Sequence, residues 1–190
     1  MFEGPRNLWG YFTMKHARLK LGTMATLPGP HQVGSEKGTD KADVYVGTNF
    51  ADRYDGGLGA DNISGGNGSD VLEGSSGKDT LNGGNGDDIL RGGTGNDTFV
   101  WTTAGEASGA PGLIDQITDF QTGYDKIDLL AFMAGGHFNV SGGLVAGGGV
   151  QVAYDRAHAL LLGDVNGDGV ADFSIYLNGA PAVAAGDFIF

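Results

Sequence analysis

Aspartate is the residue of this sequence whose spacing most clearly indicates chemistry. It recurs every nine residues through five regular nonapeptides, and two decayed copies precede them at the same interval. Carboxylate and backbone carbonyl oxygens are the ligands that Ca²⁺ prefers, in sets of about 6–8. The spacing therefore indicates a row of calcium sites. The repeating residues are Asp43, Asp52, Asp61, Asp70, Asp79, Asp88 and Asp97.

Glycine surrounds these aspartates in a fixed pattern. The five regular copies, between Gly56 and Val100, follow the template G-G-x-G-x-D-x-U-x, in which U is apolar. Because glycine has no Cβ, it permits a positive φ and lets carbonyl oxygens crowd inward around a cation. Ser75 replaces the second glycine of one copy, and the decayed copies 38–46 and 47–55 keep few glycines. The glycines expected to line the sites are Gly57, Gly59, Gly66, Gly68, Gly77, Gly84, Gly86, Gly93 and Gly95.

The last three positions of each repeat predict a short strand. The eighth residue is apolar in every regular copy, and in an extended segment it would point into a thin core while its neighbours point outward. Each nonapeptide is therefore expected to form a turn followed by a strand. The apolar residues are Ile63, Leu72, Leu81, Leu90 and Phe99.

The template resembles the calcium-binding nonapeptide of the RTX, or hemolysin-type, repeat family. The resemblance implies an all-β fold, a right-handed parallel β-roll in which two nonapeptides form one turn and Ca²⁺ lies between successive turns. About four or five ions would then lie between stacked aspartates, bound most weakly in the decayed copies. One side of the roll would stack Asp43, Asp61, Asp79 and Asp97, and the other Asp52, Asp70 and Asp88.

Electrostatics would make such a roll depend on calcium. Strands stack about 4.8 Å apart, and two carboxylates at that spacing repel by roughly 3 kcal/mol at an effective dielectric constant of about 20. Extracellular calcium modules have dissociation constants of roughly 10⁻⁴–10⁻³ M. We therefore expect the roll to be unfolded in the calcium-poor cytoplasm and to fold outside the cell.

The nine-residue period stops at Trp101. Beyond it, the I-x-D-F element at Ile117–Phe120 and the D-x-I-D-L element at Asp125–Leu129 resemble the region after the β-roll in the serralysin family of secreted metalloproteases. The resemblance implies a β-sandwich-like C-terminal cap. Members of that family place further calcium ligands in this region, so three acids are either ligands or solvated turn residues: Asp119, Asp125 and Asp128.

A second candidate calcium site is the segment D-V-N-G-D-G-V-A-D, residues 164–172. Its polar residues match positions 1, 3, 5 and 9 of an EF-hand loop, with Gly169 at position 6. However, Ile175 replaces the glutamate of position 12, and strand-like runs flank the segment, so it is not an EF-hand. It is either a calcium-binding hairpin loop or an Asx-rich turn. The candidate ligands are Asp164, Asn166, Asp168 and Asp172.

The chain ends in Asp187, Phe188, Ile189 and Phe190. One acidic residue followed by three apolar ones resembles the uncleaved C-terminal export signal of type I secretion substrates in Gram-negative bacteria. The N-terminal residues also lack the continuous apolar run of a cleavable signal peptide. The resemblance implies a protein exported by type I secretion machinery to the extracellular medium.

Composition restricts the other partners. With 23 acidic residues against 11 Lys and Arg, the formal charge is −12, which disfavours nucleic acid and anionic membranes. No apolar run reaches the roughly 18 residues of a membrane span. Cysteine is absent, so metal is the evident substitute for disulfide staples. We expect a poorly defined lead segment (1–36), the roll (37–101), and a serralysin-like C-terminal β domain with the export signal (102–190).

No catalytic motif is evident in the chain. Its four histidines form no H-E-x-x-H zinc site, and no G-x-S-x-G nucleophile motif occurs. The chain is interpreted as a non-catalytic module for export, folding and stabilisation. Three alternatives stay open: the C-terminal part of a serralysin-like zinc metalloprotease with a fused catalytic domain, a repeat module of an epimerase-like enzyme that binds a polysaccharide such as alginate, and an adhesin or surface-layer fragment.

Overall fold

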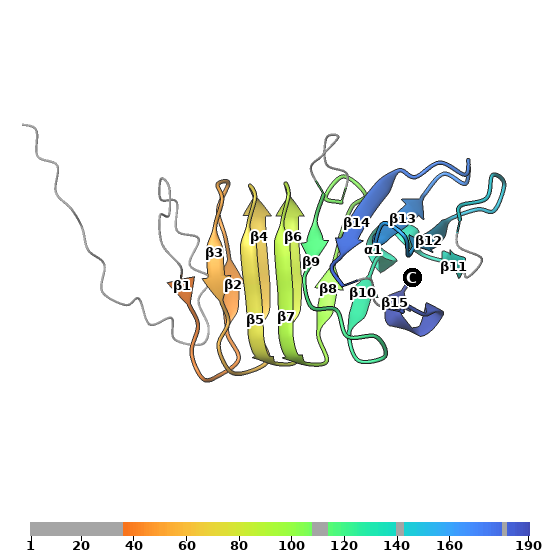
Figure 1. Cartoon of the computed structure of the whole chain (residues 1–190). Coiled ribbons are helices and arrows are strands. Elements are labelled where there is room, and N and C mark those ends of the chain that lie inside the picture. Colours follow the sequence, from red (N-terminus) through yellow and green to blue (C-terminus); the bar gives the residue numbers. More distant parts are fainter. Residues whose placement is uncertain (1–35, 108–113, 140–142, 180–181) are drawn as a thin grey trace, which may run out of the picture.

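The computed structural model describes residues 36–107, 114–139, 143–179 and 182–190. Apart from its last residue, the lead segment predicted over 1–36 lies outside this range. Within it the regular secondary structure is almost entirely β-strand, arranged as two sheets that run along a solenoid (Figure 1). This confirms the all-β parallel β-roll expected from the nonapeptides.

Alternate repeats supply alternate sheets. Counted from the decayed copy 38–46, the odd-numbered copies form most of a six-stranded sheet in which all neighbouring strands are parallel. Its order is β2 (Val44–Val46), β4 (Asn62–Asn67), β6 (Thr80–Asn85), β8 (Thr98–Val100), β10 (Lys126–Asp128) and β15 (Phe188–Ile189).

The even-numbered copies begin a nine-stranded sheet. Its first part is parallel and runs β1 (Glu36–Lys37), β3 (Arg53–Asp55), β5 (Val71–Gly77), β7 (Ile89–Gly95) and β9 (Gln116–Ile117). It continues through β14 (Phe173–Leu177), β13 (Leu160–Asp164), β12 (Gln151–Asp155) and β11 (His137–Asn139). The β12–β13 and β13–β14 pairs are antiparallel.

The core is built from the eighth residue of each repeat. In the six-stranded sheet Ile63, Leu81 and Phe99 lie in register, and Ile127 continues their row. Leu72, Leu90 and Ile117 form the matching row in the other sheet. All seven side chains are fully buried in one apolar cluster. Burial of each contributes about 1.5–3 kcal/mol, so this row drives the strands to stack in a single register.

The roll does not end where the nonapeptide period ends. Strands β9 and β10 extend both sheets beyond Trp101, each from a D-x-I triplet that keeps only the aspartate and the apolar residue of the template. After β10, the short helix α1 (Leu130–Met133) leads into the hairpin strands of the C-terminal part. A 3₁₀ turn at Ala185–Asp187 then directs the last strand, β15, onto β10.

Candidate metal centres in two aspartate columns

The repeating aspartates lie in two columns, one beside each sheet. Along the first column the N–H of Asp43 donates to Oδ1 of Asp61 at 2.8 Å, and the same bond links Asp61 to Asp79 at 2.8 Å. Asp79 is joined in the same way to Asp97, at 2.9 Å. Each carboxylate is thus fixed by the backbone of the preceding turn, with one oxygen used and the other left over.

The second column repeats this arrangement. Asp52 donates to Asp70, and Asp70 donates to Asp88, both at 2.8 Å. The alternation of the repeats therefore decides which carboxylates are neighbours, as the sequence analysis expects. Because consecutive nonapeptides go to opposite sheets, aspartates adjacent in a column are 18 residues apart in the chain.

Each column continues one residue beyond the regular repeats. The N–H of Asp97 donates to Oδ1 of Asp125 at 3.0 Å, and the N–H of Asp88 donates to Oδ1 of Asp115 at 2.8 Å. Asp125 was a candidate from the sequence, but Asp115 was missed. The signal that could have found it is the triplet Asp115-Gln116-Ile117, which has the D-x-U spacing of a repeat without its glycines.

Unpaired carboxylate oxygens mark the regular repeats. In each of the five, Oδ2 of the aspartate is buried and has no hydrogen-bond partner among the described residues. A buried carboxylate oxygen without a donor is costly, so native structures normally pair it with a donor or a metal ion. The five side chains are 0–2% exposed. They belong to Asp61, Asp70, Asp79, Asp88 and Asp97.

Glycine makes the room in which these oxygens lie. A Cβ on the first glycine of a repeat would overlap the aspartate Oδ2 of the same repeat, as at Gly56 and Asp61. At the fourth position Gly77 has a φ of +147°, and a Cβ there would overlap the carbonyl oxygen of Gly59 one turn earlier. Carboxylate and carbonyl oxygens therefore crowd the same space, which is the oxygen-rich surrounding that Ca²⁺ requires.

Burial strongly disfavours the charged form of these carboxylates. It raises the pKa of Asp70 to about 7 and the pKa values of Asp88 and Asp97 to about 6, and nearby carboxylates add to the rise. Burial also raises the pKa values of Asp61 and Asp79. A bound divalent cation would reverse this penalty, because it would supply the opposite charge that the columns lack.

The donor set fits calcium better than a metal bound by side chains alone. Among the described residues no group of three or more His, Cys, Asp or Glu side chains could hold a metal ion. A cation in the columns would therefore be held by one or two carboxylates together with backbone carbonyls. Oxygen-only coordination of this kind suits Ca²⁺, which tolerates irregular geometry.

Protein donors close the columns at their ends. Oδ2 of Asp115 accepts the indole N–H of Trp101 at 2.7 Å, and Oδ2 of Asp125 accepts the N–H of Gln121 at 2.8 Å. At the other end, Oδ2 of Asp43 and Oδ2 of Asp52 each accept two bonds from a threonine. Among the described aspartates of the two columns, the buried Oδ2 atoms without a partner are thus confined to the regular repeats.

Two further sequence candidates bind backbone N–H groups. Asp119 accepts the N–H of Gly92 at 3.0 Å and that of Gly93 at 2.8 Å, where the next turn of the roll would otherwise supply acceptors. Asp128 accepts the N–H of Leu130 at 3.0 Å, at the start of α1. Both carboxylates therefore accept backbone N–H groups of a turn or a helix start.

The loop at 164–172 connects β13 and β14 as a hairpin. Asp164 is fully buried; its Oδ1 accepts the N–H of Gly167 at 2.6 Å and its Oδ2 that of Gly169 at 2.8 Å. Asp172 accepts the N–H of Val165 at 2.7 Å, and the side chains of Asn166 and Asp168 accept backbone N–H groups two residues ahead. This is the bonding of an Asx-rich turn, and calcium binding at this loop stays a prediction.

The four C-terminal residues are part of the roll. Asp187 is 2% exposed, and its carboxylate accepts the N–H groups of Gly123 and Ala184, both at 2.8 Å. Phe188 lies in register with Ile127 and stacks on Phe138, with ring centroids 4.9 Å apart. In the folded chain the predicted export signal is therefore an edge strand and its cap.

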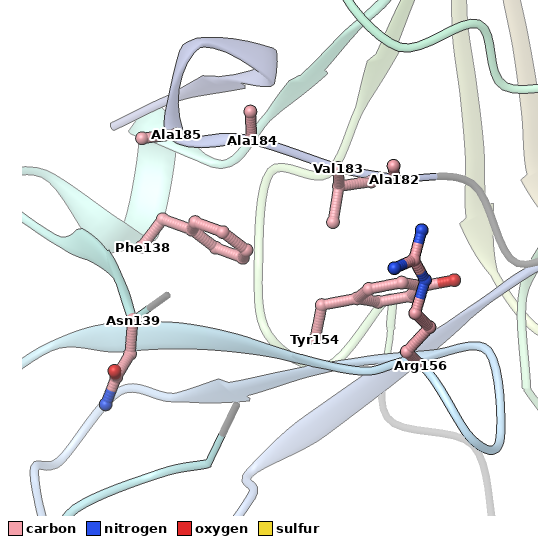
Figure 2. A pocket seen from close by; sticks show the side chains of 8 residues that line it. All are labelled: Phe138, Asn139, Tyr154, Arg156, Ala182, Val183, Ala184 and Ala185. Atoms are coloured by element: carbon pink, nitrogen blue, oxygen red, sulfur yellow. The ribbon is translucent and has the colours of Figure 1, made fainter. Parts of the chain in front are cut away.

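The C-terminal part also contains a cavity of about 350 Å³, shown in Figure 2. Phe138 and Tyr154 face it from β11 and β12, and the segment 182–185 forms its opposite wall. Among the described residues that line it, Arg156 is the only charged one. None of the aspartates of the two columns lines this cavity. In the described part of the chain, no helix is long and apolar enough to cross a membrane.

The fold and the columns together define a class of protein: a calcium-binding repeat module built as a parallel β-roll. The family model described as peptidase M10 serralysin C terminal matches residues 54–190, and the chain belongs to that family. This confirms the RTX-type and serralysin-like resemblance.

The solved structures that resemble the chain include two subunits of the mannuronan C5-epimerase of Azotobacter vinelandii. The solution structure of the AlgE6R3 subunit is 27% identical and covers 86% of each chain, with a TM-score of 0.49. That of the AlgE6R2 subunit is 29% identical and covers 83% of this chain and 90% of its own, also with a TM-score of 0.49. No curated protein sequence matches the chain.

Proposed function

We propose that this chain is a non-catalytic module whose roll folds on binding about five calcium ions after export from the cell. The observation that carries the proposal is the set of five buried Oδ2 atoms, one in each regular repeat, that have no partner among the residues the structure describes. These oxygens, with the carbonyls that crowd them, would hold the ions. Without a cation, the same carboxylates oppose the roll through burial and mutual repulsion.

Calcium-dependent folding is tested by circular dichroism and by calorimetry. In millimolar calcium the chain should give a strand-rich spectrum, and EGTA should convert it to that of a largely unfolded chain. Magnesium at the same concentration is the matched control, because its smaller ion demands a nearly ideal octahedron that a carbonyl-lined loop does not offer. A spectrum unchanged by EGTA would refute the proposal, as would equal folding in magnesium.

We further propose that Asp187–Phe190 is read by type I secretion machinery before the chain folds. The support is that these residues are bonded into the roll once it has formed, with Asp187 buried and Phe188 only 8% exposed. In a calcium-poor cytoplasm the strand would be free for recognition. Calcium outside the cell would then fold this strand into the roll. Because the folded chain cannot return through the exporter, export would proceed in one direction.

The export proposal is tested by deleting the last four residues. In a Gram-negative host with a type I exporter, the intact chain should reach the medium and the truncated chain should remain in the cells. Since the deletion also removes β15, the truncated chain should be purified and its folding in calcium measured. Secretion of the truncated chain at the level of the intact one would refute the proposal.

A further inference from the structure

Threonine closes the first carboxylate of each column. Oδ2 of Asp43 accepts the backbone N–H of Thr39 at 2.6 Å and its hydroxyl at 2.8 Å. Oδ2 of Asp52 accepts the N–H of Thr48 at 2.7 Å and its hydroxyl at 3.0 Å. Both threonines occupy the second position of a decayed repeat, four residues before the aspartate. The oxygen that is unpaired in the regular repeats is therefore doubly paired here.

The backbone at the second position differs between the two kinds of repeat. In the regular copies this residue has a positive φ of 74–102°. Thr39 and Thr48 are not among the residues with positive φ. The peptide plane before the threonine is therefore oriented so that its N–H reaches the carboxylate. The positive-φ residues are Gly57, Gly66, Ser75, Gly84 and Gly93.

The threonine side chain explains why φ at the second position is not positive in the decayed repeats. A β-branched residue is rarely found at positive φ, because its Cβ substituents collide with the backbone. Threonine at this position therefore prevents the loop conformation that the glycines adopt, and its hydroxyl supplies a second donor. The fourth position, glycine in every regular copy, is Lys41 in one decayed repeat and Phe50 in the other. The threonines thus pair the oxygen that a cation would need, and neither decayed repeat keeps the glycine of the fourth position.

The remaining oxygen of Asp52 does not alter this comparison. Its Oδ1 is buried without a partner among the described residues, but Oδ1 is the atom that elsewhere accepts the N–H of the preceding turn. No described residue precedes Asp52 in its column. The atom that distinguishes the regular repeats is Oδ2, and in both decayed repeats Oδ2 is satisfied by protein.

We propose that Thr39 and Thr48 take the place of calcium in the first turn, so that the ladder of ions begins at Asp61 and Asp70. The first two repeats then form a metal-free cap at the N-terminal end of the described columns. This inference rests on the proposed calcium-dependent function and specifies where its sites begin. The sequence alone predicts that Asp43 and Asp52 are the weakest calcium ligands, whereas under this proposal they bind no calcium.

Calcium stoichiometry of the full chain, measured by equilibrium dialysis, tests the cap. Asp52→Asn should bind as many ions as the parent chain, whereas the matched change Asp70→Asn in the same column should bind one fewer. A Thr48→Gly/Phe50→Gly chain, which restores both glycines of the template, should bind one more.

The outcomes separate this inference from the proposed function. If the parent chain binds no calcium, the proposed function fails. If it binds calcium and Asp52→Asn loses an ion, the calcium function stands and the threonine cap is wrong. If the double variant folds and gains no ion, threonine is not what excludes the metal; should it not fold, the comparison of Asp52→Asn with Asp70→Asn still decides.

Discussion

Replacing Asp88 with asparagine removes one buried charge while keeping the shape of the side chain. Asp88 is fully buried, its Oδ1 accepts the N–H of Asp70 at 2.8 Å, and its Oδ2 has no partner in the described part of the chain. An asparagine can keep the first bond but cannot offer a charged oxygen to a cation. The preceding residue, Asp87, is partly exposed and belongs to neither column. Asp87→Asn is therefore a control of identical chemistry one residue away.

The expected magnitude follows from linkage between binding and folding. Above its dissociation constant, each ion that binds only the folded chain adds about 1.4 kcal/mol to the free energy of unfolding per tenfold rise in free calcium. Five ions give a slope of about 7 kcal/mol per decade, and four give about 5.5 kcal/mol. Asp88→Asn should lose one ion's share of the slope, and Asp87→Asn should lose none.

At low calcium the sign should reverse. Carboxylates stacked about 4.8 Å apart repel by roughly 3 kcal/mol at an effective dielectric constant of about 20. Burial also raises the pKa of Asp88 to about 6, so its ionised form is destabilised at neutral pH. Neutral asparagine relieves both costs. At low calcium, the folded chain can be stabilised by an osmolyte such as sucrose. The variant should then fold at a lower osmolyte concentration than the parent chain.

The assay is urea unfolding followed by circular dichroism, at free calcium concentrations of about 2 and about 20 mM, which exceed the affinity range of extracellular modules. The difference between the two unfolding free energies gives the slope for each chain. If Asp88→Asn retains the parent slope, Asp88 binds no ion. If Asp87→Asn loses as much as Asp88→Asn, the effect is one of net charge and the column reasoning is wrong.

Three further predictions address the loops, the column end and pH. Gly77→Ala should cost more than about 3 kcal/mol in urea melts, because a Cβ there overlaps a backbone oxygen; Gly123→Ala, also at positive φ but with nothing within 4 Å, should cost only about 1–2 kcal/mol. Trp101→Phe should lower thermal stability by about 2–3 kcal/mol even in saturating calcium, because it leaves Oδ2 of Asp115 unpaired; an unchanged melting temperature would contradict this. Lowering the pH from about 7.5 to about 5.5 should shift the calcium midpoint upward, since protons compete for Asp70, whose pKa is about 7. The metal-free roll should instead gain stability over that range, because a raised folded-state pKa favours the protonated folded chain; a midpoint independent of pH would contradict the assignment.

The regular nonapeptides could be predicted because their information is local and periodic. A nine-residue period fixes which residues turn and which extend, and two repeats per turn fix which aspartates are neighbours. The eighth residues Ile63, Leu81 and Phe99 accordingly lie in one fully buried row. The turn glycines, the aspartates and the apolar core residues of the repeats all favour the same structure.

The continuation of the roll could not be read in the same way. Asp115 and Asp125 each keep a D-x-I triplet. Asp115 follows Asp97 by 18 residues, or two periods, so the alternation would place it in the column of Asp97, but it accepts the N–H of Asp88 in the other column. Asp125 follows Asp97 by 28 residues, which is not a multiple of nine. What brings them into the columns is strand pairing of β9 with β7 and of β10 with β8. That pairing depends on burial of Ile117 and Ile127, which is a tertiary effect that a three-residue pattern only weakly signals.

The same aspartate pattern can leave a carboxylate oxygen open for a cation or pair it with a protein donor, depending on its place in the column. A carboxylate fixed by the preceding turn always has one oxygen left, and a solenoid must satisfy that oxygen in every turn. In the middle, glycines keep protein donors away and the oxygen stays open for a cation. At the ends, Thr39, Thr48, Gln121 and Trp101 supply an N–H or hydroxyl. Under the proposed cap, the second repeat position would decide whether a turn binds calcium: glycine or Ser75 at positive φ in the regular copies, threonine in the decayed ones.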